Sequence, residues 1–201
     1  MSLFPIFVKL EGRTVLVVGA GSVAQGKIGG LLAAGALVRV VAPEATSAVT
    51  EWAQQGVLAW EQRTFAPSDL DDAFLVIAAT SSTSLNHTIF TEARRRNVLC
   101  NAVDDPDNCD FYYPAVVRRG DFQIAISTAG HSPALAQRLR QELEVQFGAE
   151  YASWVEELGK YRQQLMASRL DPEARKQMLH DIASRQAFES MRGEQEREKL
   201  S

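Results

Sequence analysis

The chain has 201 residues, of which 46% are hydrophobic, and this is enough apolar content for one substantial domain and a smaller one. Its 21 basic and 25 acidic residues give a formal net charge of −4, which argues against general binding to nucleic acid or to an anionic membrane. The two cysteines form no C-x-x-C pair, and no apolar run approaches the ~18 residues of a membrane span, so we expect a soluble protein of the cytoplasm.

Residues 3–10 form a short apolar lead-in, which is read as an edge strand or a cap. The segment from Thr14 to Ala24 is an apolar run that ends in glycines and continues into a helical pattern. Residues 15–18 do not alternate with polar residues, which is typical of a strand buried on both faces of a parallel sheet. The next residues match G-x-G-x-x-A, a loop in which the backbone approaches a pyrophosphate at the start of a helix, although such glycines can also form a simple turn. The predicted cofactor contacts are Gly19, Gly21, Ser22, Val23 and Ala24.

A second buried strand is predicted from Leu37 to Val41. Many dinucleotide-binding folds place an acid at the tip of this strand, where it binds the adenosine ribose. The tip here is Ala42, followed by Pro43 and Glu44, and Glu44 is read equally well as a ribose ligand or as a solvated loop residue. Because no arginine stands at the tip, the pattern favours NAD over NADP.

Residues 46–55 predict a helix, 57–60 a strand and 74–79 another unalternating strand. This last strand ends in Thr80 and Ser81, at the edge of the sheet where ligands bind in open α/β folds. We interpret both as candidate cofactor contacts. The alternative role is to cap the helix whose apolar residues follow at positions 85, 89 and 93.

The strand predicted over residues 98–103 ends in Asp104, which is followed by Asp105 and Pro106. A carboxylate at this strand tip faces the same crevice as the glycine loop, so Asp104 is the candidate catalytic residue. The alternative is an Asp-Asp-Pro turn, because aspartates commonly begin turns.

After residue 110 the pattern changes from βα units to a hairpin. Residues 114–118 and 122–127 predict two strands, and Ser132 with Pro133 begins a helix with an apolar stripe. This hairpin and helix are well suited to pairing with a second copy of the chain. Further helices are predicted from residue 150 and from residue 171, followed by a charged, frayed tail from residue 193.

Several short motifs follow one another in order from Phe4 to Leu165. They are Phe4-Pro5-Ile6-Phe7, Val17–Ala24 with Lys27, Gly35-Ala36, Val40–Pro43, Ile77–Thr80, Asn101–Pro106 with Phe111 and Pro114, and Ala125–Pro133. In this order and spacing they resemble the siroheme synthase N-terminal module, the family of precorrin-2 dehydrogenases and sirohydrochlorin ferrochelatases.

We expect an α/β fold in three parts: a Rossmann-like NAD-binding domain over residues 1–113, a dimerisation hairpin and helix over 114–148, and a C-terminal helical region over 149–201. The resemblance, which runs from Phe4 to Leu165, covers the first two parts and the beginning of the third. It implies a homodimer that oxidises the tetrapyrrole precorrin-2 with NAD, and it places the family's key aspartate on Asp104. Nucleotide contacts are implied at Gly21 to Val23, Pro43 and Glu44. The implied substrate side comprises Asn101, Thr128, His131, Ser132, Arg118, Arg119 and Arg138.

Asp104 would act as the base that removes a proton, or would stabilise the cationic macrocycle. The arginines would bind substrate carboxylates, or would only contribute to the solubility of the protein surface. The sequence indicates no resident metal site. Two alternatives remain open: an enzyme that also inserts Fe²⁺ or Co²⁺ as a substrate, and a non-catalytic module that senses NAD.

Overall fold

The computed structural model describes residues 3–198, with side chains as far as residue 193. It divides into two compact units, residues 1–113 and residues 114–201. Within the described range, none of the helices combines the length and the apolar character needed to cross a membrane.

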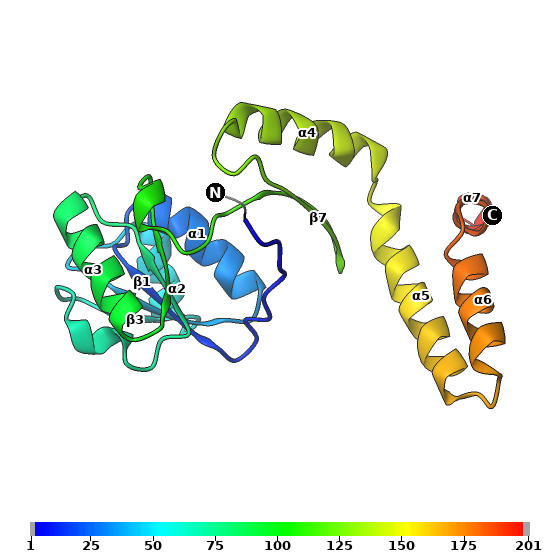
Figure 1. The fold of residues 1–201 in the computed structure, drawn as a ribbon, viewed down its shortest axis with the longest axis horizontal. Coiled ribbons are helices and arrows are strands. Elements are labelled where there is room, and N and C mark those ends of the chain that lie inside the picture. The colour runs from blue at the N-terminus through cyan, green and yellow to red at the C-terminus, as the bar shows by residue number, and fades with distance from the viewer. Residues whose placement is uncertain (1–2, 199–201) are drawn as a thin grey trace. The chain divides into compact units, whose positions relative to one another are not determined.

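The first unit is built on a five-stranded parallel sheet with the strand order β3-β2-β1-β4-β5. This sheet lies in the blue-to-green part of the chain in Figure 1. The chain starts at the central strand, proceeds outward to β3, and returns to the other side of β1 for β4 and β5. The order therefore reverses between β1 and β4, which is where open α/β sheets bind their ligands. The strands are β1 (Thr14–Val18), β2 (Leu37–Val41), β3 (Ala59–Glu61), β4 (Leu75–Ala78) and β5 (Leu99–Ala102).

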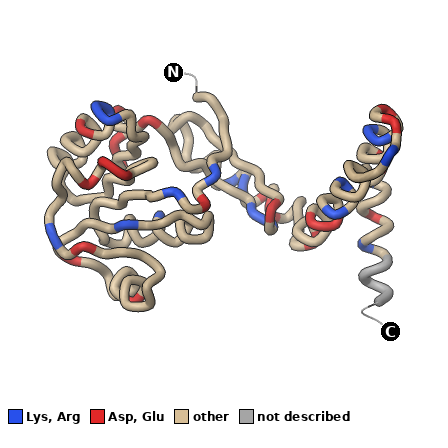
Figure 2. Tube along the Cα trace, turned by 90° about the horizontal axis from the view of Figure 1, so that it is seen from below, with Lys and Arg blue, Asp and Glu red and all other residues tan. Residues whose placement is uncertain are grey.

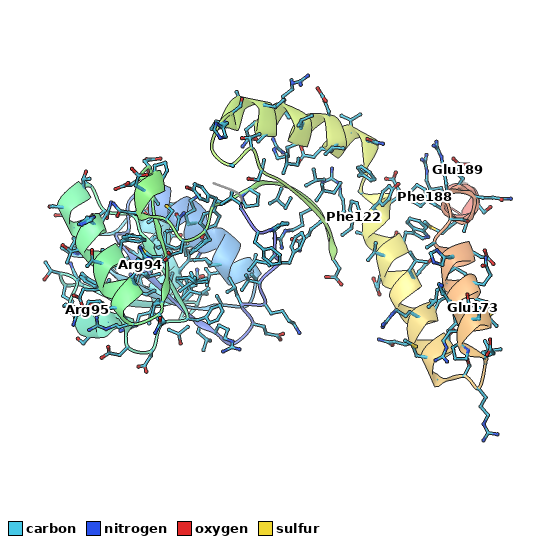
Figure 3. The ribbon with its side chains drawn as sticks, viewed as in Figure 1. Arg94, Arg95, Phe122, Glu173, Phe188 and Glu189 are labelled. Carbon is cyan, nitrogen blue, oxygen red and sulfur yellow. The ribbon has the colours of Figure 1, made fainter. Side chains whose placement is uncertain are left out.

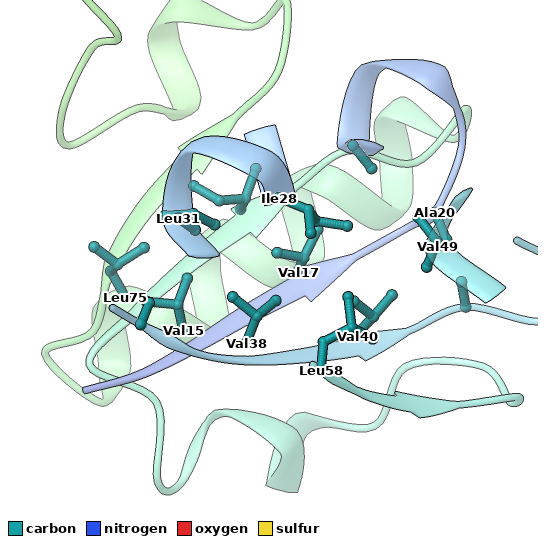
Figure 4. Packing of buried hydrophobic residues seen from close by; sticks show 14 residues of the cluster. Val15, Val17, Ala20, Ile28, Leu31, Val38, Val40, Val49, Leu58 and Leu75 are labelled. Carbon is teal, nitrogen blue, oxygen red and sulfur yellow. The ribbon is translucent and has the colours of Figure 1, made fainter. Parts of the chain in front are cut away.

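Helices cover both faces of this sheet, as the unalternating strands predict. On one face, α1 (Ser22–Ala33) and α2 (Ser47–Gln54) pack against the odd-numbered side chains of β1 (Figure 4). On the other face, α3 (Thr83–Arg95) packs against the even-numbered ones. All four side chains from Val15 to Val18 are at most 2% exposed, and burying a side chain of this size contributes roughly 1.5–3 kcal/mol. The α/β class is thus confirmed.

Two short 3-10 helices lie in the connections of the first unit. The helix η1 (Pro67–Leu70) precedes β4, and η2 (Pro106–Asn108) follows β5. Each begins with proline, which has no N–H to lose at the first helical position. The helix α3 ends in Arg94 and Arg95, whose charges suit the negative end of the helix dipole (Figure 3).

The second unit contains the predicted hairpin followed by helices. Strands β6 (Ala115–Arg119) and β7 (Phe122–Ile126) pair antiparallel, and Gly120 between them has a φ of +55°. Only glycine adopts this conformation without strain, which explains the tight turn. The helices are α4 (Pro133–Gln146), α5 (Glu150–Ala167), α6 (Pro172–Ile182) and α7 (Arg185–Glu198).

A run of aromatic rings forms the core of the second unit. Tyr151 on α5 lies 5.1 Å from Phe122, 5.1 Å from Phe147 and 4.6 Å from Phe188, measured between ring centroids. Trp154 packs on Phe188 at 4.6 Å. These contacts attach α7 and β7 to α5 (Figure 3). Basic and acidic residues are interspersed along the C-terminal helices (Figure 2), with i,i+4 ion pairs such as Lys160 with Glu156.

At the ends of the chain, two expectations were wrong: the strand alternative for residues 3–10 and the frayed tail. The apolar lead-in, residues 3–10, forms no strand, and Phe4 and Phe7 are 86% and 71% exposed. Pro5 in its middle has no N–H to donate to a ladder. The frayed tail predicted from residue 193 is helical to Glu198, because α7 is fixed earlier by the Ser184 cap and by Phe188 in the aromatic core. Residues 199–201 of that tail lie outside the described range.

Candidate active site

The glycine loop touches the tip of the neighbouring strand β4. Gly19 has a φ of +102°, and a Cβ added to it would lie 2.3 Å from the carbonyl oxygen of Ala79. Its N–H donates to the carbonyl of Val41 at 3.0 Å, and the N–H of Ala79 donates to that of Val18 at 2.8 Å. Both the dihedral angle and the close approach therefore require glycine at position 19.

The helix α1 begins directly after this turn, with Gly21 as its N-cap residue. No hydrogen bond from a described side chain caps its first turn, and that turn contains no acidic residue. A Cβ at Gly21 would meet nothing within 4 Å, so the space in front of the N-terminus is open. Ala24 is fully buried against the sheet. Free N–H groups of Ser22 and Val23, an open approach and the helix dipole are what a pyrophosphate requires, so the residues fit a dinucleotide.

The turn after β4 is organised by a buried asparagine that the sequence motifs did not identify. The side-chain oxygen of Asn86 accepts from the Thr80 hydroxyl at 2.7 Å, and its amide donates to the Thr80 carbonyl at 3.2 Å. Ser82 caps α3 by accepting from the N–H of Leu85, which leaves Ser81 exposed on the loop. The only signal available in the sequence was a polar residue among the apolar positions of that helix.

At the tip of β2, Pro43 and Glu44 are exposed and Ala42 is buried. The arginine within this strand, Arg39, forms an ion pair with Glu61 at 3.3 Å and donates to the carbonyl of Asp69. Its guanidinium is therefore engaged on the face of the sheet that α3 covers.

Asp69 is the buried carboxylate of this network. Arg63 donates to both of its oxygens, at 2.9 and 2.6 Å, and the N–H of Ala66 donates at 2.8 Å. Burial alone would raise the pKa of Asp69, but these hydrogen bonds and the charges of Arg63 and Arg39 outweigh it and hold the pKa below its usual value. Both arginines closest to the tips of β2 and β3 are thus neutralised by carboxylates.

Asp104 stands two residues beyond β5, exposed and in a left-handed conformation with a φ of +60°. The N–H of Val103 donates to the carbonyl of Ala78 at 2.9 Å, so the tip of β5 adjoins that of β4. Left-handed backbone is rare for residues other than glycine, although aspartate and asparagine tolerate it best. Such strain persists only where the surroundings impose it, and it is concentrated at functional sites.

A chain of hydrogen bonds holds the loop that carries Asp104. The N–H of Asp105 donates to the carbonyl of Ala102 at 3.2 Å, and the amide of Asn108 donates to the Asp105 carboxylate at 2.7 Å. The amide oxygen of Asn108 lies 3.1 Å from Nδ1 of His87 on α3. His87 and Asn108 were not among the predicted site residues, because their pairing joins segments that are 21 positions apart.

Asn101, a predicted substrate residue, is buried on β5. Its amide donates to the carbonyl of Phe111 at 2.8 Å and to the sulfur of Cys109 at 3.3 Å. Burial raises the pKa of the Cys109 thiol and raises that of Cys100 to about 12, so both stay protonated at neutral pH. The side chain of Asn101 thus holds the segment that follows β5 through Cys109 and Phe111. Its contact with substrate stays a prediction.

The predicted substrate residues of the second unit surround the start of α4. The hydroxyl of Thr128 accepts from the N–H of Ser132 at 3.1 Å, and Ser132 in turn caps α4 by accepting from Leu135. His131 is exposed on the same loop, and its N–H donates to the carbonyl of Thr128 at 2.9 Å. The loop turns through Ala129, whose φ of +50° is left-handed.

The three predicted arginines differ in what they contact. Arg119 donates to the carbonyls of Phe147 and Glu144 at 3.0 Å each and so satisfies the C-terminal end of α4. Arg138 is exposed and pairs with Glu142 at 3.1 Å, whereas Arg118 is exposed on the hairpin. Across residues 3–193, where side chains are described, no three histidines, cysteines or acids are arranged to hold a metal ion.

Two family models match the chain. Residues 6–115 match the model described as putative NAD(P)-binding, and residues 119–146 match that of the central part of a sirohaem biosynthesis protein. The first match covers the whole parallel sheet and confirms a nicotinamide dinucleotide as the class of cofactor.

The relatives of this chain include siroheme synthases, in agreement with the second family model. The chain is 42% identical over 188 residues to the siroheme synthase of Photorhabdus laumondii, covering 94% of this chain and 38% of that protein. It is 40% identical to siroheme synthase 1 of Serratia proteamaculans, of which it covers 37%. The chain thus spans less than two fifths of these relatives. Among solved structures, SirC, a precorrin-2 dehydrogenase, superposes with a TM-score of 0.79 at 27% identity, and 92% of each chain is covered.

Proposed function

We propose that this chain, which belongs to the siroheme synthase N-terminal module family, is an NAD-dependent dehydrogenase that oxidises precorrin-2 to sirohydrochlorin. The observation that carries the proposal is the exposed carboxylate of Asp104, on left-handed backbone after β5, at the same edge of the sheet as the dinucleotide-binding turn after β1. The similarity to SirC, a precorrin-2 dehydrogenase that matches over 92% of this chain, supports it. The two free cysteines support the reducing cytoplasm as its compartment.

The cofactor would be held at the reversal point of the sheet. The N–H groups of Ser22 and Val23 would bind its pyrophosphate, Gly19 and Gly21 would give it room, and Thr80 with Ser81 would line the opposite side. Pro43, Glu44 and Ala24 complete the proposed set.

We propose NAD rather than NADP because of the charges at the tip of β2. A 2′-phosphate needs a free cationic partner there. Arg39 and Arg63 are already bound to Glu61 and Asp69, and the exposed carboxylate of Glu44 would repel a phosphate.

The reaction removes a hydride and a proton from the macrocycle. When bound, the nicotinamide ring supplies the hydride acceptor. The proton passes to an Oδ atom of Asp104, which the left-handed backbone presents at the exposed tip of β5. Because the carboxylate is exposed, substrate can reach it, and it can also stabilise positive charge on the macrocycle.

The second unit would supply the remaining substrate contacts and the dimer interface. Of the three predicted arginines, Arg118 and Arg138 are exposed, and they would bind substrate carboxylates. His131 with Thr128 and Ser132 would form the loop beside the substrate. The two-stranded sheet of β6 and β7 supports dimerisation, because so small a sheet is marginal alone and its outer edges can pair with a second copy. We divide the chain into a cofactor domain (1–113), a dimerisation segment (114–148) and a helical region (149–201).

The test is to mix the purified protein with precorrin-2 and with either NAD or NADP, and to follow the reduced cofactor by absorbance. We expect NADH to form with the sirohydrochlorin spectrum, and NADP to react much more slowly. NAD binding without NADH formation would favour a nucleotide-sensing module instead. Insertion of Fe²⁺ or Co²⁺ into sirohydrochlorin is a separate activity, which metal-dependent bleaching of the product spectrum would measure.

A further inference from the structure

Lys27 lies in the second turn of α1, and its side chain extends over the ring of Tyr113. It is one of two lysines in the first unit, and its side chain is partly buried. Its ammonium nitrogen lies 3.8 Å from the centroid of the Tyr113 ring. Tyr113 is 41% exposed as a residue, but burial around its phenol group raises its pKa to about 12. The ring therefore faces the lysine as a neutral phenol. The ring can therefore attract the cation without neutralising it.

The ammonium group of Lys27 has no carboxylate bound to it. Among the residues that the structure describes, none accepts a hydrogen bond from the ammonium or forms an ion pair with it, and the Tyr113 ring is its ring contact, so its N–H donors are unused within the protein. Arg13 and Arg94 also lie over aromatic rings, but both are exposed. Burial lowers the pKa of Lys27, and the charge of Asp104 partly offsets this effect. The charges of Lys27 and Asp104 therefore influence each other, although the two side chains form no ion pair.

The arrangement at Lys27 differs from that of the other partly buried basic groups of the first unit. Arg63 and Arg96, for example, each have carboxylate partners, and Lys9 is exposed to water. A partly dehydrated ammonium with unused donors is unfavourable until an anion binds it. Lys27 thus has the features of a ligand-binding group rather than of a structural ion pair.

We propose that Lys27 binds a carboxylate of the tetrapyrrole substrate and so holds the macrocycle against Asp104. The proposal rests on the proposed function and extends it with a substrate contact in the cofactor-binding unit. The oxyanion could come from substrate or from the cofactor pyrophosphate. We favour the substrate because Lys27 is five residues beyond Ser22, about 7.5 Å along the helix axis from the N–H groups that receive phosphate.

The test compares Lys27→Met, which keeps the length and apolar character of the stem, with Lys27→Arg, which keeps the charge. Lys9→Met is the matched control at an exposed lysine. The measurements are the equilibrium Kd of sirohydrochlorin by fluorescence quenching, the Kd of NAD, and the KM and kcat for precorrin-2. Thermal melting checks that each variant is folded.

We expect Lys27→Met to raise the Kd of sirohydrochlorin and the KM for precorrin-2 roughly 10- to 100-fold, as for loss of a charged hydrogen bond. The Kd of NAD and kcat should change by less than about twofold, because a contact made equally in ground and transition states affects KM alone. Lys27→Arg should restore most of the affinity, and Lys9→Met should match the wild type. Tyr113→Leu should weaken sirohydrochlorin binding by about fivefold.

An unchanged Kd of sirohydrochlorin in folded Lys27→Met would overturn the proposal, and so would weaker binding of NAD alone, which would assign Lys27 to the cofactor. A lower kcat with both affinities intact would also overturn it. Failure of the proposed function looks different: the wild type would bind sirohydrochlorin, with Lys27 still required, yet form no NADH from precorrin-2.

Discussion

Replacing Gly19 by alanine should destabilise the first unit, because two features of the structure exclude a side chain there. The φ of +102° lies outside the regions open to L-residues, and forcing an alanine into left-handed backbone costs about 1–2 kcal/mol. The added Cβ would also lie 2.3 Å from the carbonyl oxygen of Ala79, about 1 Å closer than an ordinary contact. The atom in the way is backbone, so the strand tip itself must move.

That movement disturbs the bond by which Ala79 donates to Val18 at 2.8 Å, which joins β4 to β1. Overpacking of this kind typically costs 1–3 kcal/mol, so the total is about 2–5 kcal/mol. For a chain of this length, the melting temperature should fall by about 4–20 °C. The free energy of unfolding would be measured by urea denaturation, and melting by circular dichroism.

Gly21→Ala is the matched control. The φ of Gly21 is −76° and its Cβ would meet nothing within 4 Å, so stability should change by less than about 0.5 kcal/mol. The same methyl group would enter the space where the pyrophosphate approaches, and the Kd of NAD should rise about tenfold or more. If Gly19→Ala melted at the same temperature as the wild type, the close approach of the glycine turn to the backbone of Ala79 would be refuted. Unchanged NAD binding by Gly21→Ala would refute the pyrophosphate site.

Three further outcomes can be measured on single variants. Asn108→Ala removes the support of the loop that carries Asp104, and kcat should fall about tenfold with the Kd of NAD unchanged; an unchanged kcat would contradict that support. Arg119→Ala should lower the free energy of unfolding, measured in urea, by about 1–2 kcal/mol through the lost bonds to the carbonyls of Phe147 and Glu144 at the end of α4. A rise in the KM for precorrin-2 without such a loss would instead make Arg119 a substrate contact. Because the pKa of Asp69 is lowered by folding, its stabilisation is complete above the unfolded pKa of about 3.9 and is lost as the pH falls through the folded value. The free energy of unfolding, measured by urea denaturation at several pH values below ~5, should therefore fall less steeply with decreasing pH in Asp69→Asn than in the wild type. Equal slopes for the two proteins would contradict this.

The strands and the glycine turn could be predicted because their signals are local. Residues 15–18 are apolar without a break, and only a strand covered on both faces buries all four. The turn at Gly19 follows from the same stretch, since a reversal directly after a buried strand requires a residue without a side chain. The hairpin could be predicted in the same way, from two short apolar runs on either side of a turn that contains Gly120.

The supports of the site could not be predicted because they depend on distant contacts. Asn86 and His87 lie on α3 like ordinary helical polar residues, and only the folded chain brings them to Thr80 and Asn108. The helix α7 was missed for the same reason, since its order comes from Phe188 in the aromatic core rather than from its charged sequence.

The most direct test of the central claim is the kcat of Asp104→Asn with precorrin-2 and NAD. Asparagine also tolerates left-handed backbone, so this substitution removes the charge while it keeps the conformation of φ +60°. We predict that kcat falls roughly 10²- to 10⁴-fold while the Kd values of NAD and sirohydrochlorin stay close to those of the wild type. A variant that retains the wild-type rate would contradict the role of Asp104 as the base of this dehydrogenase.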